Sequence, residues 1–213
     1  MIFKIRDTLR RHVKNNSKKY FLLLLVFIAG VSAGAFTVNG LSTIQREELA
    51  NYFQGFLQLF DSQNMECGEL LKVSILENAR LVIALWVLGV TIIGIPFIYV
   101  LIGIRGFITG FTSGFIIETL GLKGVLFIFF ALLPKEIVII PFLIAMGVNG
   151  INFSLDIIKS KSIRHLSKES LKTNFLAYCM TTLFFTGFIF IGVLIEAYII
   201  PVFIRIILPL VTS

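Results

Sequence analysis

Charged residues are scarce in this sequence, and several long stretches contain none. Aspartate, glutamate, lysine and arginine make up 15% of the 213 residues, whereas hydrophobic residues make up 57%. A soluble domain has about 25% charged and roughly 45–50% apolar residues. A water-exposed fold of this size could not bury so much apolar surface, so the composition predicts an integral membrane protein.

Residues that carry chemistry are also few. Two cysteines and two histidines are too few for a disulfide framework or a metal site. Neither a His-Glu-x-x-His nor a Gly-x-Ser-x-Gly motif occurs. The acids Glu118, Asp156 and Glu196 fall near the predicted ends of apolar runs, so no ionisable residue is expected near the middle of the membrane. These absences argue against an ion-coupled transporter and predict a protein with no catalytic residues, cofactor or metal.

The apolar runs define the expected architecture. A membrane-spanning helix needs about 20 mostly apolar residues. The sequence predicts a single all-α integral membrane domain over residues 1–213, with about five transmembrane helices. Arg105 is expected at a tight turn between the second and third spans. The segment 121–135, which ends near Pro134, is expected to be re-entrant or interfacial. The predicted spans are residues 20–38, 81–104, 106–120, 137–155 and 174–195.

The distribution of charge predicts the orientation. Residues 1–19 and the loop 158–172 are basic, and short basic segments remain in the cytoplasm. The segment 39–80 carries six acids against three bases and is expected outside the membrane. Five crossings then place the N-terminus in the cytoplasm and the C-terminus outside, and the first apolar run is retained rather than cleaved. The net charge of +7 lies at the ends of apolar runs, which favours membrane lipids rather than nucleic acid as its partner.

The extracytoplasmic segment contains an amphipathic pattern. Ser42 and Gln45 have the spacing of a capping box, which marks the start of a helix. Large apolar residues then recur every three or four positions, as on one helix face. This face either packs on the protein's own spans or the outer leaflet, or docks a partner domain. Its residues are Leu49, Phe53, Phe56 and Phe60.

Glycines recur at four-residue intervals in two of the predicted spans. Gly106, Gly110 and Gly114 form one stripe, and Gly30 and Gly34 form another. Such stripes let membrane helices approach closely. The packing partner is either another span of the same chain or a second copy in a homo-oligomer. Two prolines, Pro96 and Pro141, fall inside predicted spans and are expected to bend them.

Several ordered motifs give the chain a resemblance to a known family. From Asn15 the chain reads NNSKKYFLLLLVFIAGVSAGAFTVNGLS, and from Leu85 it reads LWVLGVTIIGIP. Arg105 begins RGFITGFTSGF, and Leu133 begins LPKEIVIIPFLIAMGVNGINFSL. Together they resemble the stage II sporulation protein M family over residues 15–158. Wider relatives typically show Leu-Pro-His-Gly followed by a glutamate, whereas Lys135, Glu136 and Ile139 stand here.

The resemblance implies a function that composition alone does not. The family implies a non-enzymatic membrane scaffold that anchors and localises the peptidoglycan-degrading stage II sporulation proteins D and P. Its expected place is the mother-cell septal or engulfing membrane, during septal wall thinning and engulfment. The alternative is a permease-like membrane subunit that works with a separate ATPase through a coupling helix between Ser160 and Leu171.

Overall fold

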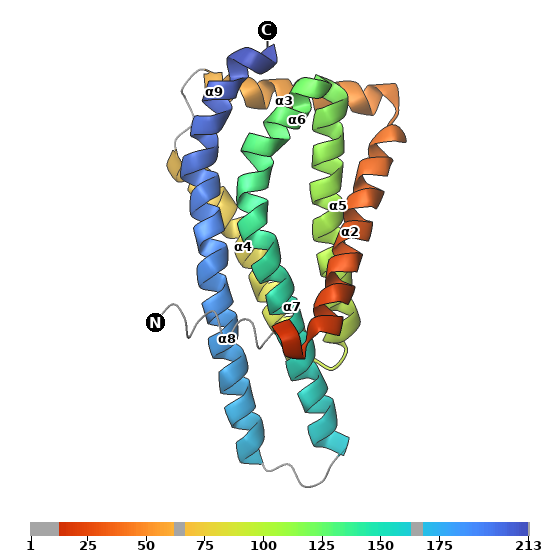
Figure 1. Ribbon diagram of the computed structural model, residues 1–213, viewed down its shortest axis with the longest axis vertical. Coiled ribbons are helices and arrows are strands. Elements are labelled where there is room, and N and C mark those ends of the chain that lie inside the picture. Colours follow the sequence, from red (N-terminus) through yellow and green to blue (C-terminus); the bar gives the residue numbers. More distant parts are fainter. Residues whose placement is uncertain (1–12, 62–66, 163–167, 213) are drawn as a thin grey trace.

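The computed structural model describes residues 13–61, 67–162 and 168–212. Helices account for nearly all of these residues, and none of them lies in a strand. The elongated bundle has helices along its length and one helix across an end (Figure 1). The helices are α2 (Ser17–Asn39), α3 (Thr43–Asp61), α4 (Cys67–Gly89), α5 (Gly94–Leu120), α6 (Leu122–Phe127), η1 (Ile128–Leu132), α7 (Leu133–Ser162), α8 (Lys168–Leu194), η2 (Ile195–Ile199) and α9 (Ile200–Thr212).

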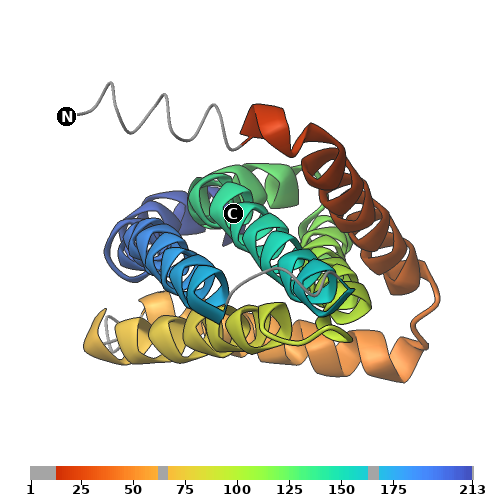
Figure 2. The same ribbon diagram turned by 90° about the horizontal axis from the view of Figure 1, so that it is seen from below.

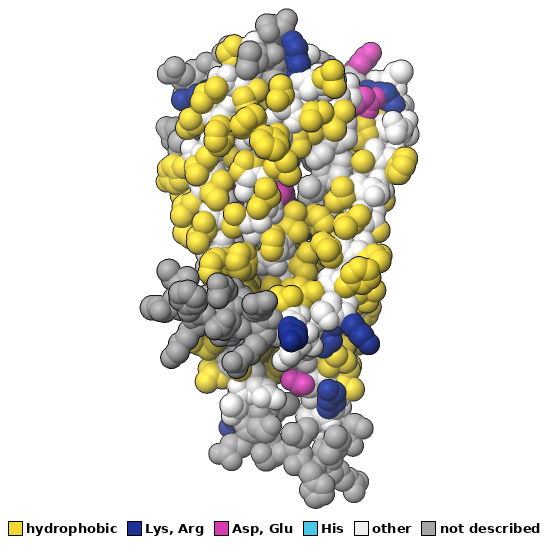
Figure 3. All heavy atoms as spheres, viewed as in Figure 1, with side chains coloured by type: hydrophobic (Ala, Val, Ile, Leu, Met, Phe, Trp, Pro, Cys, Tyr) yellow, Lys and Arg dark blue, Asp and Glu magenta, His cyan; other side chains and the backbone are white. Residues whose placement is uncertain are grey.

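Helical stretches of membrane-spanning length confirm the predicted class, an all-α multi-pass membrane protein. Among the described residues, four stretches are long and apolar enough to cross a bilayer: Ser17–Asn39, Gly94–Leu120, Leu122–Ser160 and Lys172–Ile207. α4 is as long as α2, at 23 residues, but it carries more charge and is not among these four stretches. It runs beside them along the bundle. The apolar belt lies between charged residues at both ends of the visible face (Figure 3).

The predicted boundary between the second and third spans is wrong. α5 continues from Gly94 to Leu120 without a break at Arg105, and the turn lies at residues 90–93. Hydropathy missed this turn because the residues on both sides of it are apolar. Pro96 lies in the first turn of α5, where a proline is tolerated, and therefore does not bend the middle of a span as expected.

Polar side chains from α7 and α8 stabilise the turn between α4 and α5. The Ser154 hydroxyl, fully buried, lies 2.8 Å from the Gly89 carbonyl oxygen and 3.0 Å from that of Thr91. The Tyr178 hydroxyl donates to the Trp86 carbonyl at 2.8 Å. Free carbonyls at the end of a helix need such partners away from water, so α7 and α8 determine where α4 can end.

The predicted re-entrant or interfacial segment 121–135 does not form a separate element. Gly121, with φ of 60°, reverses the chain after α5, and α6, η1 and α7 then continue as one helical stretch. Pro134 does not end this stretch. In a regular α-helix the Pro134 ring would clash with the carbonyl four residues earlier. The wider π-helical turn at Ile128–Leu132 accommodates the ring. α5 and the stretch that begins at Leu122 form a hairpin of two long helices rather than a re-entrant loop.

The core forms around α7, which lies at the centre of the bundle when viewed along its length (Figure 2). Every residue from Leu143 to Ile151 is buried. The Asn149 amide donates to Thr182 Oγ1 at 3.2 Å and to the Tyr178 carbonyl at 3.3 Å, which joins α7 to α8. Pro141 lies within α7, as its position in the sequence predicts.

α3 lies across one end of the bundle (Figure 1). The predicted capping box at its start is confirmed, because the Ser42 amide donates to Gln45 Oε1 at 3.0 Å and the Gln45 amide to Ser42 Oγ at 3.4 Å. Arg46 then forms an ion pair with Glu118 at the end of α5. α3 is thus tied to the helices beneath it.

Candidate functional site

An ion pair lies inside the bundle between α5 and α7. Arg105 Nη2 is 2.8 Å from Glu136 Oε1, and the two side chains are only 13% and 7% exposed. Arg105 is eleven residues from the start of α5 and fifteen from its end. At about 1.5 Å per residue it lies roughly 16 Å from the nearer end, which is mid-depth in a hydrocarbon layer about 30 Å thick.

A second ion pair joins the neighbouring residue of α7 to the last helical stretch. Lys135 pairs with Glu196 in η2, and each side chain is 18% exposed. Pro201 follows η2, and its ring would clash with the carbonyl of Ala197, four residues earlier, so the π-helical turn again accommodates a proline. π-helical turns often occur at functional sites. Here two of them flank the charged residues that cross-link the bundle.

These pairs correct the expectation that no ionisable residue lies near mid-depth. Glu196 lies within the long stretch Lys172–Ile207 rather than near a span end. Arg105 lies inside a helix rather than at a turn. The error followed from the span boundaries, since a misplaced boundary moves a buried charge to an apparent surface. Glu118 does lie near the end of α5, as expected.

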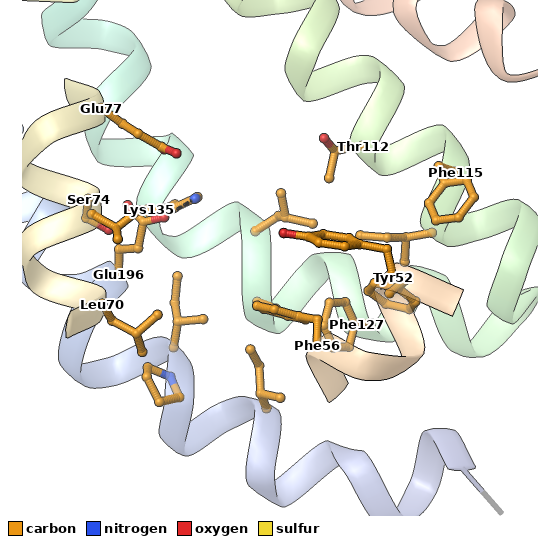
Figure 4. A pocket seen from close by; sticks show the side chains of 18 of the residues that line it. Tyr52, Phe56, Leu70, Ser74, Glu77, Thr112, Phe115, Phe127, Lys135 and Glu196 are labelled. Carbon is orange, nitrogen blue, oxygen red and sulfur yellow. Dashed lines mark hydrogen bonds and ion pairs between the residues drawn. The ribbon is translucent and has the colours of Figure 1, made fainter. Parts of the chain in front are cut away.

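A cavity of about 490 Å³ lies between α3, α4, α5, η1 and α9. Its walls are mostly apolar, and its polar side is formed by Ser74 and Glu77 of α4 together with the Lys135–Glu196 pair. Figure 4 shows Tyr52, Phe56 and Phe127 across the cavity from Glu77 and Lys135. Three buried polar atoms, Asn78 Oδ1, Arg105 Nε and Glu136 Oε2, have no hydrogen-bond partner among the described residues.

The predicted amphipathic face of α3 covers this cavity. Phe53 is buried and packs edge-on against Phe115 at 6.2 Å and Phe127 at 5.7 Å between ring centroids. Leu49 and Phe56 are partly buried against the same cluster. Phe60 lies on α3, but its side chain is outside the described residues. The described part of this face therefore packs on the protein's own helices and is not open to a partner.

The predicted glycine stripes lie against each other between α2 and α5. A Cβ atom added at Gly30 would be 2.3 Å from the Gly103 carbonyl oxygen, and one at Gly34 would be 2.1 Å from that of Phe107. On the other helix, a Cβ atom at Gly106 would be 2.3 Å from the Phe27 oxygen, and one at Gly110 would be 2.0 Å from the Val31 oxygen. The contact at Gly114 is looser, at 3.2 Å. These stripes pack within one chain.

A known protein family matches the chain over most of its length. The family model of stage II sporulation protein M matches residues 23–201, which include α3, both charged pairs and both π-helical turns. The chain belongs to the stage II sporulation protein M family. No curated protein matches it, and no solved structure matches it.

In this member of the sporulation family, the buried charges between α5, α7 and η2 are paired. Each buried acid of the two pairs has a basic partner, so the charges largely neutralise each other. Among the described residues, no group of three His, Cys, Asp or Glu side chains could hold a metal. His12 and His165 lie outside the described residues. Family membership makes the chain a sporulation-related membrane protein.

Proposed function

We propose that this protein is a non-enzymatic membrane scaffold that anchors and localises the stage II sporulation proteins D and P. The family match over residues 23–201 carries the proposal. On this proposal the chain acts during engulfment, in which those two partners thin the septal peptidoglycan. The proposed location is the mother-cell septal or engulfing membrane, with the N-terminus in the cytoplasm and the C-terminus outside.

The arrangement of α3 supports a scaffold. Its apolar face is held by the bundle, and the side turned away from the bundle presents exposed polar side chains, among them Glu47, Glu48 and Gln54. Because Arg46 and the capping box hold α3 in place, the exposed face is a rigid platform. On the proposed orientation it lies on the same side of the membrane as the septal wall.

Deletion and complementation test this proposal. In sporulating cells that lack the protein, fluorescent fusions of D and P should lose their septal localisation, and engulfment should stop. Wild-type protein should restore both. The substitution Glu48→Lys should restore less, whereas Lys159→Gln, which removes an exposed charge near the end of α7, should restore both. Normal localisation of both hydrolases in the deletion strain would refute the scaffold function.

The permease-like alternative is favoured by one observation, the mid-depth charges beside a cavity. The coupling helix that it requires does not form as a separate element in the described residues, since α7 runs to Ser162 and α8 begins at Lys168. Residues 163–167 lie outside the described residues. Reproducible recovery of an ATPase with the purified protein, lost on substitution of Arg164 or Lys168, would favour this alternative.

A further inference from the structure

Another cavity, of about 450 Å³, lies between the first turns of α2 and the first half of α7. α2 contributes Tyr20, Phe21 and Leu24, and α7 contributes residues 140–142, 144 and 145. Val13, just before α2, completes the lining. We call this cavity the α2–α7 groove. Its lining is apolar except for the Tyr20 hydroxyl, and its volume is in the range of ligand sites, roughly 300–1,000 Å³.

The sequence of α7 explains why the helices leave a hollow here. Pro141 and Ala145 are four positions apart, so they lie on one face of the helix, and both side chains are short. Ala145 is only 5% exposed, whereas Phe21 and Leu24 of α2 are 67% and 43% exposed. A buried floor below an exposed apolar rim makes a groove that opens toward lipid.

The start of α2 is fixed against α7. Lys19 donates a hydrogen bond to the Asn152 side chain of α7, which holds the two walls of the groove together. The chain changes direction at Asn16, with φ of −120° and ψ of 21°, between the helical residues 13–15 and α2 (Figure 2). The groove is therefore lined from both sides of this bend, by Val13 before it and by α2 after it.

Positive charge lies at the same end of the groove. Lys14 follows Val13, and Lys18 and Ser17 come three and four positions before Phe21, one helical turn away on the same side of α2. All three polar side chains are exposed. Neither lysine forms an ion pair with a described residue, and the first turn of α2 contains no acid. Figure 3 shows basic side chains below the apolar belt on the face that contains α2.

We propose that the α2–α7 groove binds an anionic phospholipid from the membrane leaflet at this end of the bundle. One acyl chain lies in the apolar groove, and Lys14, Ser17 and Lys18 hold the phosphate. Ammonium groups form strong hydrogen bonds to phosphate oxygens, and basic pockets between membrane helices bind acidic lipid headgroups. A zwitterionic lipid would bring its own positive group to these unpaired lysines, so a headgroup of net negative charge is preferred.

Photocrosslinking of the purified full-length protein tests the site. The protein is placed in phosphatidylcholine nanodiscs that contain a trace of phosphatidylglycerol with a photoreactive acyl chain, and labelled peptides are identified by mass spectrometry. Residues 20–24 and 140–145 should be labelled at least about fivefold more than by phosphatidylcholine with the same photoreactive chain. Lys14→Gln with Lys18→Gln should lower the labelling by phosphatidylglycerol about tenfold, because each lysine near the surface attracts acidic lipid.

Two matched controls separate this site from a general affinity for lipid. Lys72→Gln with Arg80→Gln removes the same charge from exposed positions on α4 and should leave the labelling unchanged. Leu24→Trp should fill the groove and prevent labelling of residues 140–145, whereas Leu25→Trp should not, since Leu25 is 48% exposed but does not line the groove.

Equal labelling by the two lipids would show an apolar surface that accepts any lipid and would overturn the proposal. Labelling absent from the groove would point to another occupant and would also overturn it, as would labelling that survives loss of both lysines. The experiment contains neither hydrolase, so its result does not bear on the scaffold proposal.

Discussion

At the scale of single residues, buried charges and close glycine contacts make the strictest demands on this protein. Arg105 and Glu136 neutralise each other, but one polar atom of each lacks a partner among the described residues. Removing one partner of such a pair leaves an uncompensated buried charge, whereas removing both does not. The glycines, in contrast, are constrained by space, since carbonyl oxygens of the facing helix occupy the positions of absent side chains.

We expect Glu136→Gln or Arg105→Met to destabilise the protein by about 3–5 kcal/mol. The double substitution Arg105→Met and Glu136→Leu should recover most of that stability, because no charge is then left unpaired. The melting temperature in detergent and the amount of protein in the membrane measure this effect. Single variants as stable as wild type would show that the pair is solvated.

Substitution of Gly110 should be poorly tolerated even by alanine. The added Cβ atom would lie 2.0 Å from the Val31 carbonyl oxygen, so α2 and α5 would have to separate. We expect Gly110→Ala to lower the melting temperature and Gly110→Leu to prevent accumulation. Gly187 in α8 is the matched control, since nothing lies within 4 Å of its added Cβ atom. Gly187→Ala should be neutral or slightly stabilising, as alanine favours helix by about 1 kcal/mol.

At the scale of helices, distant polar groups decide where the elements end. The turn between α4 and α5 contains no break in hydropathy. The Ser154 hydroxyl of α7 holds it in place, because this hydroxyl lies within hydrogen-bond distance of the Gly89 and Thr91 carbonyl oxygens. Prolines show the opposite case, because Pro134 and Pro201 do not end their helices but are accommodated by π-helical turns. A local signal for a helix end is therefore overruled wherever neighbouring helices supply the missing contacts.

Ser154→Ala should destabilise the α4–α5 turn. The hydroxyl is fully buried, and its loss removes the donor to the Gly89 carbonyl oxygen, at a cost of about 1–3 kcal/mol. Ser160→Ala is the control, since that hydroxyl bonds only to the Ile157 carbonyl in its own helix. The melting temperature should fall for the first variant alone. An equal change in both would mean that water replaces the Ser154 hydroxyl.

At the scale of the whole molecule, the helices place α3 and the far ends of α7 and α8 at opposite ends of the bundle (Figure 1). The described residues of the two basic segments, 13–19, 158–162 and 168–172, lie toward the second of these ends. If they remain in the cytoplasm, α3 and the mouth of the cavity beneath it belong to the outer half of the membrane.

Labelling of single cysteines tests this orientation. In a cysteine-free protein, Glu48→Cys on α3 should react with a membrane-impermeant maleimide in intact cells. Lys159→Cys near the end of α7 should react only after the cells are permeabilised. Both native side chains are exposed, so accessibility within the fold does not separate them. The reverse pattern of labelling would invert the proposed topology.

The sequence by itself determined the features that depend on local composition and spacing. Scarce charge and long apolar runs determine a helical membrane protein, and the pattern from Ser42 to Phe56 determines a capped amphipathic helix. Only the tertiary structure decided that α5 begins at Gly94, that Arg105 meets Glu136, and that the face of α3 covers a cavity. The physical reason is that hydropathy reports whether a residue favours an apolar environment. It does not report whether lipid or another helix supplies that environment, and in this bundle that choice sets the helix ends and the partners of the charges.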